Sequence, residues 1–576
     1  MFSLKRFILL ILFIFTFFLM TCSTIKNDRN LKHQFSNPIL SGFYPDPSIC
    51  KVDSDFYLIT STFSYFPGIP VFHSRNLVNW ELIGHVMSRS EQMNLDGLGV
   101  SRGIFAPTIR YHEGTFYVVC TLVDAGGNFV ITSKRPEGPW SNPVFIPQID
   151  GIDPSLFFDN DGKAYIVYNS IPPDNISLYN GHRTIRMYEF DKVDLKVIGE
   201  EVILVNGGTD ISKKPIWIEA PHQYKIDGIY YLMCAEGGTA EGHSEVIFRS
   251  EKVEGPYIPY KYNPILTQRH LDPERENPIT CTGHADIVQL DSGDWWAVFL
   301  GCRPYPPYDG NYFNTGRETF LTPVGWIDDW PVINPNYERV QYRYDYPITC
   351  KEKISQAPYG GNFTVKDDFN SSEIGRDWLF LRTPHEQWYD LEKEPGSLTI
   401  QLRPETCSGE KNPSFIGRRQ QHLSCSAVVS MKFAAKSENE KAGLLIFQGE
   451  NNYYFLSKSI SQKDQIVQLY KSVKNKDDQK QLKLLAEQKV DHFDALNPIY
   501  LKIKANGGLY NFYYSLNSAD WILLKENADG TFLSTRTAGG FVGSIFAMYA
   551  TSHGKESNNL VSFDWFEYTG NGTTNN

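Results

Sequence analysis

Up to residue 345, apolar and polar positions follow one pattern five times over. Each copy has a polar or small residue at its head, a short apolar stretch, a turn, and a second stretch with aromatic residues. The turns are rich in Asp, Ser, Asn and Gly, which favour β-hairpins. The five copies begin at Asp46 (DPSICKVDSDFYLI), Ala106 (APTIRYHEGTFYVV), Asp153 (DPSLFFDNDGKAYIVY), Glu219 (EAPHQYKIDGIYYLM) and His284 (HADIVQLDSGDWWAVF).

The spacing of these copies predicts a five-bladed β-propeller over residues 37–345. Successive heads are 60, 47, 66 and 65 residues apart (46→106→153→219→284), which suits propeller blades of several strands each. Because the innermost strand of every blade lines the central channel, we expect the five heads to face one pocket. The prediction therefore brings Asp46, Asp153, Glu219 and His284 together around one axis.

A different pattern follows, and it predicts a second all-β domain. Residues 346–364 contain Gly and Pro among polar residues and are interpreted as a linker. From 365 to 570 the chain has short alternating stretches such as AGLLIFQG, IYLKIKAN and VSFDWFEY. These stretches show no helical period, so they predict a β-sandwich of jelly-roll type. The lysine-rich stretch 463–489 is interpreted as the solvent-facing side of a hairpin.

The first residues predict an export signal with a lipid anchor. Two basic residues precede an apolar run from Phe7 to Met20, which suits a signal-peptide core and is short for a membrane span. The run ends in Leu-Met-Thr-Cys, which resembles a bacterial lipoprotein signal with Cys22 as the lipidated residue. Residues 1–22 are therefore interpreted as the signal and 23–36 as a tether, with an ordinary signal peptide as the alternative. The mature protein would be exported and anchored in the cell envelope, facing the periplasm or the cell exterior.

Composition excludes several classes of function. The 576 residues carry 66 acidic and 55 basic side chains, for a formal net charge of −11. Nucleic acid is not an expected partner, because phosphate binding requires a basic surface. The cysteines form no Cys-x-x-Cys pair, which argues against zinc-ribbon and thioredoxin-like sites. Membrane contact is expected only through the N-terminal lipid, and the sequence does not indicate an oligomeric state.

Three converging carboxyl groups suggest hydrolysis of a glycosidic bond. Asp46 and Asp153 both stand before Pro-Ser, and both are expected to be extended, because proline disfavours the helical region for the preceding residue. Glycosidases need one ionised and one protonated carboxyl, and carboxyls gathered in one channel shift each other's pKa. We expect Asp46 and Glu219 to face each other at about 6.5–9.5 Å, the separation that leads to inversion.

The motifs around these residues resemble glycoside hydrolase family 43 over residues 37–340. GFYPDPSI is similar to its catalytic-base motif, GIDPSLFFDNDGKAYIVY to its auxiliary-acid motif and PIWIEAPHQY to its general-acid motif. CTGHADIV and NTGRETFL are similar to its channel-histidine and substrate-arginine motifs. The C-terminal sandwich resembles the concanavalin-like domain of its β-xylosidase and α-L-arabinofuranosidase members. The resemblance implies Asp46 as general base, Glu219 as general acid and Asp153 as the residue that tunes and orients the acid.

The resemblance also implies substrate-binding residues. Arg317 would hold sugar hydroxyls, and Phe63 and Phe105 would form aromatic walls, Phe105 standing where many relatives have tryptophan. The alternatives are a surface ion pair for Arg317 and blade packing for Phe63. His284 would lie at the channel base, either near a Ca²⁺ ion through water or as a hydrogen-bonded core histidine. Relatives with β-xylosidase activity often have a further tryptophan after the auxiliary aspartate, which NSIPPDNISLYNGH (169–182) lacks.

Together these features predict an inverting, exo-acting glycosidase that releases terminal pentoses from plant hemicellulose or its oligosaccharides. A pocket closed by an appended domain favours chain ends. α-L-Arabinofuranose is placed slightly ahead of β-D-xylose, because SYFPGIPVFHS and SRGIFAPTIRY resemble the arabinofuranosidase branch. No cofactor is expected for catalysis. The alternatives are an endo-acting arabinanase or xylanase, a retaining fructan-type enzyme on the same propeller, and a non-catalytic glycan-binding lipoprotein.

Overall fold

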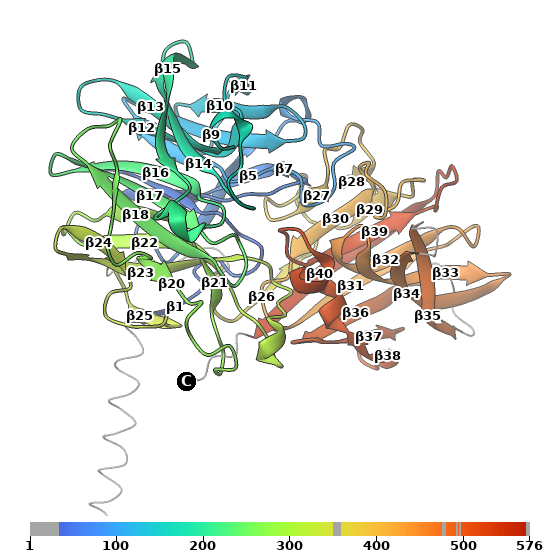
Figure 1. Cartoon of the computed structure of the whole chain (residues 1–576). Helices are drawn as coiled ribbons and strands as arrows, with labels where there is room; N and C mark the ends of the chain where they lie inside the picture. The colour runs from blue at the N-terminus through green and yellow to red at the C-terminus, as the bar shows by residue number, and fades with distance from the viewer. Residues whose placement is uncertain (1–33, 349–358, 475–479, 491–493, 495–496, 572–576) are drawn as a thin grey trace, which may run out of the picture.

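The computed structural model describes residues 34–348, 359–474, 480–490, 494 and 497–571. The predicted signal, its anchor Cys22 and most of the predicted tether lie outside these residues. Within the described ranges, no helix is long and apolar enough to cross a membrane. Two all-β domains lie side by side, a propeller formed by the N-terminal part of the chain and a sandwich formed by the C-terminal part (Figure 1). Both predicted fold classes are confirmed.

The propeller has five antiparallel sheets, one for each repeat of the sequence pattern. The inner strand of each sheet begins at or close to the predicted head, and the following strands step outward by hairpins. The first blade contains β2 (Ser48–Val52), β3 (Asp55–Ile59), β5 (Gly68–Ser74) and β6 (Glu81–Met87), and the second contains β7 (Gly103–Ile104), β8 (Thr108–His112), β9 (Thr115–Val123), β10 (Gly127–Ser133) and β11 (Val144–Phe145). The third blade contains β12 (Gly151–Phe158), β13 (Ala164–Ser170), β14 (Thr184–Asp191) and β15 (Lys196–Asn206), and the fourth contains β16 (Glu219–Ile226), β17 (Ile229–Glu236), β18 (Ser244–Ser250), β19 (Ile258–Pro259) and β20 (Leu266–Thr267). The fifth blade contains β21 (Thr280–Gln289), β22 (Trp295–Cys302), β23 (Glu318–Ile327) and β24 (Trp330–Ile333).

Turn chemistry and apolar layers explain why these segments form blades. Between β16 and β17, Asp227 and Gly228 have φ values of 50° and 85°, as a two-residue hairpin turn with the right-handed strand twist requires. Neighbouring blades then pack through their alternate side chains. Phe157 of the third blade and Leu232 of the fourth belong to one buried cluster, and each such side chain contributes about 1.5–3 kcal/mol on burial.

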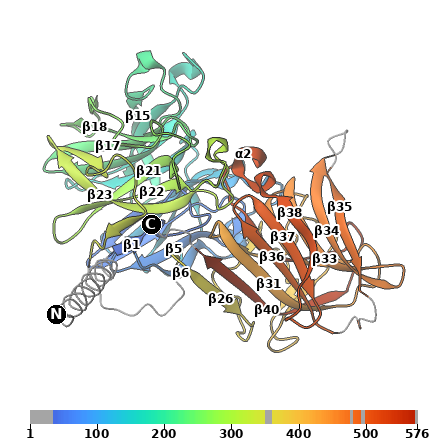
Figure 2. The ribbon, with the colours of Figure 1, turned by 90° about the horizontal axis from the view of Figure 1, so that it is seen from below.

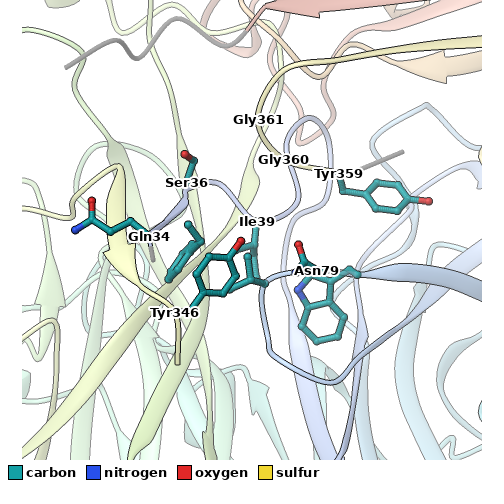
Figure 3. A pocket seen from close by; sticks show the side chains of 11 residues that line it. Gln34, Ser36, Ile39, Asn79, Tyr346, Tyr359, Gly360 and Gly361 are labelled. Atoms are coloured by element: carbon teal, nitrogen blue, oxygen red, sulfur yellow. The ribbon is translucent and has the colours of Figure 1, made fainter. Parts of the chain in front are cut away.

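The ring is closed by the N-terminal end of the propeller. β1 (Gln34–Ser36) pairs with β25 (Arg343–Asp345), so pairing begins within the stretch 23–36 expected to be a tether. Asn37 donates to the carbonyl of Leu321 at 2.8 Å and accepts from the amide of the same residue at 2.9 Å, which ties the first residues to the fifth blade. A cavity of about 250 Å³ lies at this closure, where Gln34, Tyr346 and Tyr359 come together (Figure 3).

The sandwich consists of two eight-stranded sheets, and one of them includes a strand from the propeller. The first sheet contains β26 (Phe363–Asp367), β28 (Tyr389–Asp390), β29 (Leu398–Gln401), β31 (Ser424–Phe433), β36 (Ile499–Asn506), β37 (Leu509–Ser515), β38 (Ile522–Asp529) and β40 (Leu560–Asn571). The second contains β4 (Tyr65–Phe66), β27 (Leu379–Leu381), β30 (Ser414–Arg419), β32 (Lys441–Gly449), β33 (Asn452–Ser461), β34 (Asp464–Lys474), β35 (Lys480–Lys489) and β39 (Ile545–Thr551). β34 and β35 pair as a hairpin in the lysine-rich stretch, and most residues of β35 are exposed.

Strand pairing and side-chain hydrogen bonds fix the sandwich against the propeller, and Figure 2 shows the two domains side by side. β4, which interrupts the first blade, pairs with β27 of the sandwich. Arg382 is fully buried at this border, donates to the carbonyl of Leu98 at 2.7 Å and pairs with the carboxylate of Glu450. The two domains are therefore one packed unit at this border, which brings a sandwich loop within reach of the propeller channel.

Candidate active site

Three of the predicted heads have left-handed backbone conformations. Asp46, Asp153 and His284 have φ values of 53°, 54° and 56°. The expectation that the two aspartates are extended was therefore wrong. Aspartate and histidine tolerate this region better than most residues, and such conformations concentrate at functional sites. Register shifts in β12 and β21 near these positions act as bulges that redirect side chains toward the channel.

Glu219, the fourth head, also lies at a bulge, but here the left-handed conformation falls on the next residue, Ala220. Glu219 begins β16, the register with β17 slips between Glu219 and His222, and Ala220 has a φ of 51°. The amide of Ala220 donates to Oδ2 of Asp153 at 3.3 Å. This bond links the third and fourth blades and places Asp153 beside the backbone that carries Glu219.

Asp46 is buried and surrounded by groups that favour its ionised form. Arg317 Nη1 donates to Oδ1 at 2.8 Å, Ser61 Oγ donates to Oδ2 at 2.5 Å, and His284 Nδ1 lies 3.7 Å from Oδ1. Burial alone would raise the pKa of Asp46, but the positive charge of Arg317, the contribution of His284 and the Ser61 hydrogen bond outweigh it and lower the pKa. Asp46 is therefore a carboxylate at neutral pH.

Glu219 and Asp153 behave in the opposite way. Burial, with the negative charge of Asp46 second, raises the pKa of Glu219 to about 7. Burial and the charges of Glu219 and Asp46 raise the pKa of Asp153 well above its usual value. Of the three carboxyls at the predicted heads, Asp46 is therefore ionised, whereas Glu219 and Asp153 keep their protons to higher pH than ordinary carboxyls do.

Phe63 and Phe105, the two predicted aromatic walls, contact an aromatic residue of the sandwich, Phe541. Phe63 is 1% exposed and stacks on Phe541, with ring centroids 5.7 Å apart and planes at 19°. Phe105 meets Phe63 edge-on at 5.2 Å and Phe541 at 5.7 Å. The guanidinium of Arg317 lies 5.8 Å from the centroid of Phe63 and 5.5 Å from that of Phe541. Arg317 is therefore buried against Asp46 and two rings and is not a surface ion pair.

The loop that carries Phe541 is held against the propeller by close backbone contacts. The Phe541 amide donates to Ser101 Oγ at 2.9 Å. A Cβ on Gly540 would lie 2.2 Å from the same oxygen, and one on Gly543 would lie 2.5 Å from the Thr315 carbonyl oxygen. Sequence reasoning did not identify Phe541; the only available signal was the glycine-rich stretch AGGFVG around it.

His284 does not provide a calcium site by itself. Burial lowers its pKa to about 4, so its ring is neutral, and the neighbouring Asp46 is already paired with Arg317. Calcium takes six to eight oxygen ligands, whereas the described residues contain no group of three or more His, Cys, Asp or Glu side chains placed to hold a metal. These residues do not fit direct coordination of Ca²⁺, and the water-mediated contact stays a prediction.

A second polar layer below the heads connects the blades. Asp286 is fully buried and accepts hydrogen bonds from Ser48 Oγ at 2.8 Å, Arg110 Nη1 at 2.8 Å and Tyr224 OH at 2.6 Å. These contacts join four blades. Burial alone would raise the pKa of Asp286, but Arg110, His222 and the hydrogen bond from Tyr224 together outweigh it and lower the pKa. Sequence reasoning missed this layer, although Ser48 and Asp286 each stand two residues after a predicted head.

Another missed pair lies close to Glu219. The guanidinium of Arg183 lies 4.0 Å from the ring centroid of Trp217, two residues before Glu219. The positive charge of Arg183 acts to lower the pKa of Glu219, against the larger effects of burial and Asp46. Trp217 is half-buried and has a φ of 51°. The pair therefore lies beside the proton-carrying carboxyl.

Comparisons with known proteins agree with this geometry. Residues 35–331 match the model of glycosyl hydrolases family 43, and residues 366–569 match the beta-xylosidase C-terminal concanavalin A-like domain. The chain is 37% identical to a xylosidase/arabinosidase of Butyrivibrio fibrisolvens over 92% of this chain and 98% of that protein. It is 38% identical to the non-reducing end alpha-L-arabinofuranosidase BoGH43B of Bacteroides ovatus over 93% and 94% of the two chains.

Solved structures extend the likeness to the whole two-domain arrangement. "Bacteroides ovatus Xyloglucan PUL GH43B" superposes with a TM-score of 0.82 at 37% identity and covers 93% of this chain and 99% of that chain. A protein retrieved from a capybara gut metagenome superposes with a TM-score of 0.83 at 39% identity and covers 90% and 95% of the two chains.

Proposed function

The chain belongs to glycosyl hydrolase family 43 and is a glycosidase, and from that premise we propose that it releases terminal pentoses from plant hemicellulose with inversion. Terminal α-L-arabinofuranose is the first expected sugar and β-D-xylose the second. The observation that carries the proposal is that the pKa values of two carboxyls in one channel are shifted in opposite directions. The pKa of Asp46 is lowered, whereas that of Glu219 is raised to about 7.

This pattern supports the two roles that we propose for hydrolysis. Asp46, held ionised by Arg317, accepts a proton from water as the water attacks the anomeric carbon. Glu219, protonated up to about pH 7, donates its proton to the departing glycosidic oxygen. Asp153 orients the acid, since it accepts from the amide next to Glu219. The predicted separation of Asp46 and Glu219 would leave room for the water between base and sugar.

Exo action is supported by the sandwich loop at the channel. Phe541 packs on Phe63 and Phe105, so the second domain contributes one side of the pocket. A pocket with a wall from each domain favours the end of a chain or a branch over the middle of a polymer. The relatives named above are a xylosidase/arabinosidase and an arabinofuranosidase acting at non-reducing ends, which supports the same choice.

Nitrophenyl pentosides test the reaction. We expect hydrolysis of nitrophenyl α-L-arabinofuranoside, and more slowly of the β-D-xyloside, with the product released in the inverted configuration by NMR. Asp46→Asn and Glu219→Gln should each lower kcat by about 10²–10⁴-fold. Asp227→Asn is the matched control, since Asp227 is an exposed carboxyl in the turn at the other end of β16. Full activity in either channel variant, or retention of configuration, would contradict the assignment.

We also propose that the protein is exported and anchored to the envelope through Cys22. The apolar run from Phe7 to Met20, followed by Leu-Met-Thr-Cys, supports this. In cells, the full-length chain should fractionate with membranes and incorporate labelled palmitate. Cys22→Ser should abolish the label and release the protein into the soluble fraction. Labelling that persists in Cys22→Ser would refute the anchor.

A further inference from the structure

A long groove lies on the propeller far from the channel heads. It is formed by the turn ends of the fourth and fifth blades, between β16–β18 and β22–β24, on the side of the propeller away from the sandwich (Figure 1). Its volume is about 1120 Å³. Glu219 begins β16 and the groove residue Ile226 ends it. Seven steps along β16 at about 3.3 Å rise each therefore place the groove about 23 Å from Glu219.

Three tryptophans and a tyrosine form one wall of this groove. Trp326 meets Trp295 at 5.7 Å with planes at 69°, and it meets Tyr231 at 5.6 Å with planes at 78°. Trp330 is covered by the guanidinium of Arg249 at 4.4 Å. Trp295 and Trp326 are only half-buried. No acceptor among the residues that the structure describes takes a hydrogen bond from their indole N–H groups, which leaves these donors available to a ligand.

The remaining lining is polar and of mixed charge. Asp227, Glu251 and Asp329 are exposed acidic residues along the groove, and Arg249 and Lys252 are the basic residues there. Neither sign of charge dominates, which argues against an anionic lipid surface or a highly charged peptide as occupant. Apolar rings beside many hydrogen-bonding groups suit a neutral ligand with apolar faces and polar edges. Sugar rings have this chemistry, since their C–H faces stack on aromatic rings while their hydroxyls bond to carboxylates, guanidinium and indole N–H.

We propose that the groove is a second, non-catalytic glycan site that binds a backbone segment of the polymer whose tips the channel removes. A volume of about 1120 Å³ is large enough for several sugar units. The identity of the polymer rests on the proposed function, whereas the existence of the site rests on the groove alone. Binding there would keep a branched chain on the enzyme through successive cleavages.

The test separates binding from catalysis. Glu219→Gln, which leaves polymer uncut, is run by native electrophoresis through gels containing soluble arabinoxylan or xyloglucan, with a gel lacking polymer as reference. We expect retardation by at least one polymer. Adding Trp326→Ala, and separately Trp295→Ala, should weaken retardation about tenfold in apparent dissociation constant. Trp521→Ala, at a half-buried tryptophan of the sandwich, should leave it unchanged.

Activity on the small substrate provides the second measurement. With Glu219 intact, Trp326→Ala and Trp295→Ala should hydrolyse nitrophenyl pentoside at the normal rate, and this result would also show that both variants fold. On the polymer, in contrast, both variants should be slower than the unchanged protein. Equal retardation with and without the two tryptophans would overturn the proposal, as would no retardation by either polymer. Loss of nitrophenyl hydrolysis in Asp46→Asn tests the catalytic proposal independently, so failure of one proposal does not imply failure of the other.

Discussion

Arg317 offers the sharpest test of how the channel sets its two pKa values. Arg317→Ala removes the cation that lies 2.8 Å from Oδ1 and 3.4 Å from Oδ2 of Asp46. Asp46 then keeps the burial that raises its pKa and loses the largest effect that lowers it. A base with a higher pKa is protonated at higher pH, so the acidic limb of the pH profile should move upward.

The size of the shift follows from the geometry. At 2.8 Å and an effective dielectric constant of about 20, the pair has a Coulomb energy on the order of 6 kcal/mol. That energy corresponds to about 4 pKa units at 1.36 kcal/mol per unit. Because rearrangement and water screening reduce such effects, aspartates beside arginines shift by about 1–3 units in practice. We therefore expect the acidic limb to rise by about 1–3 pH units.

The assay is kcat/KM for nitrophenyl α-L-arabinofuranoside against pH, since this ratio reports the pKa values of the free enzyme. The basic limb reports Glu219 near pH 7 and should move in the same direction, because Arg317 also lowers the pKa of Glu219. Arg317→Lys retains the charge and should shift the acidic limb less than Arg317→Ala. If the acidic limb of Arg317→Ala coincides with that of the unchanged protein, Arg317 does not set the pKa of the base.

Three further variants probe other parts of the channel. Asp286→Asn leaves the partly buried Arg110 without its carboxylate, so we expect a loss of up to about 3–5 kcal/mol of stability in urea unfolding. An unchanged midpoint would contradict the role of the lower layer. Gly540→Ala places a Cβ 2.2 Å from Ser101 Oγ and should lower kcat/KM by up to about 10²-fold, because it displaces the loop that carries Phe541. Adding Ser101→Gly should restore part of the activity. An unchanged kcat/KM in Gly540→Ala would show that the position of the loop is unimportant. Glu245 is buried, and burial raises its pKa. The folded state therefore keeps a proton on Glu245 that the unfolded state releases above about pH 4.5. Because the unfolded state binds fewer protons, the stability of the fold decreases as pH rises. Glu245→Gln should therefore increasingly exceed the unchanged protein in melting temperature from pH 5 to pH 8, and parallel curves would refute this.

The blade architecture could be predicted because it repeats locally. Each copy of the pattern contains its own hairpin, so the chain specified five similar sheets before any long-range contact was known. The sandwich strands AGLLIFQG, IYLKIKAN and VSFDWFEY were likewise predicted from alternation and form β32, β36 and most of β40. The inclusion of β4 in the sandwich could not be predicted this way, since its two residues pair with β27 more than 300 positions away.

The convergence of the heads could be predicted, but their conformation could not. Equivalent positions in equivalent blades must face the same channel, and this brought Asp46 and Glu219 together. The left-handed backbone of Asp46 and Asp153 depends on bulges whose register is fixed by neighbouring strands. Phe541 could not be identified in this way, because its contact with Phe63 joins residues of two different domains that are far apart in the sequence.

The two polar layers of the channel divide the tasks of catalysis and stability. In the lower layer, both oxygens of Asp286 accept hydrogen bonds from neighbouring blades, which fixes the ring geometry. In the upper layer, Arg317 Nε and Glu245 Oε1 are buried without a hydrogen-bond partner among the described residues, and Asp46 has a strained backbone. Buried polar atoms of this kind cost stability. We infer that the satisfied layer holds the blades rigidly enough to keep the unsatisfied layer in place until a sugar binds there.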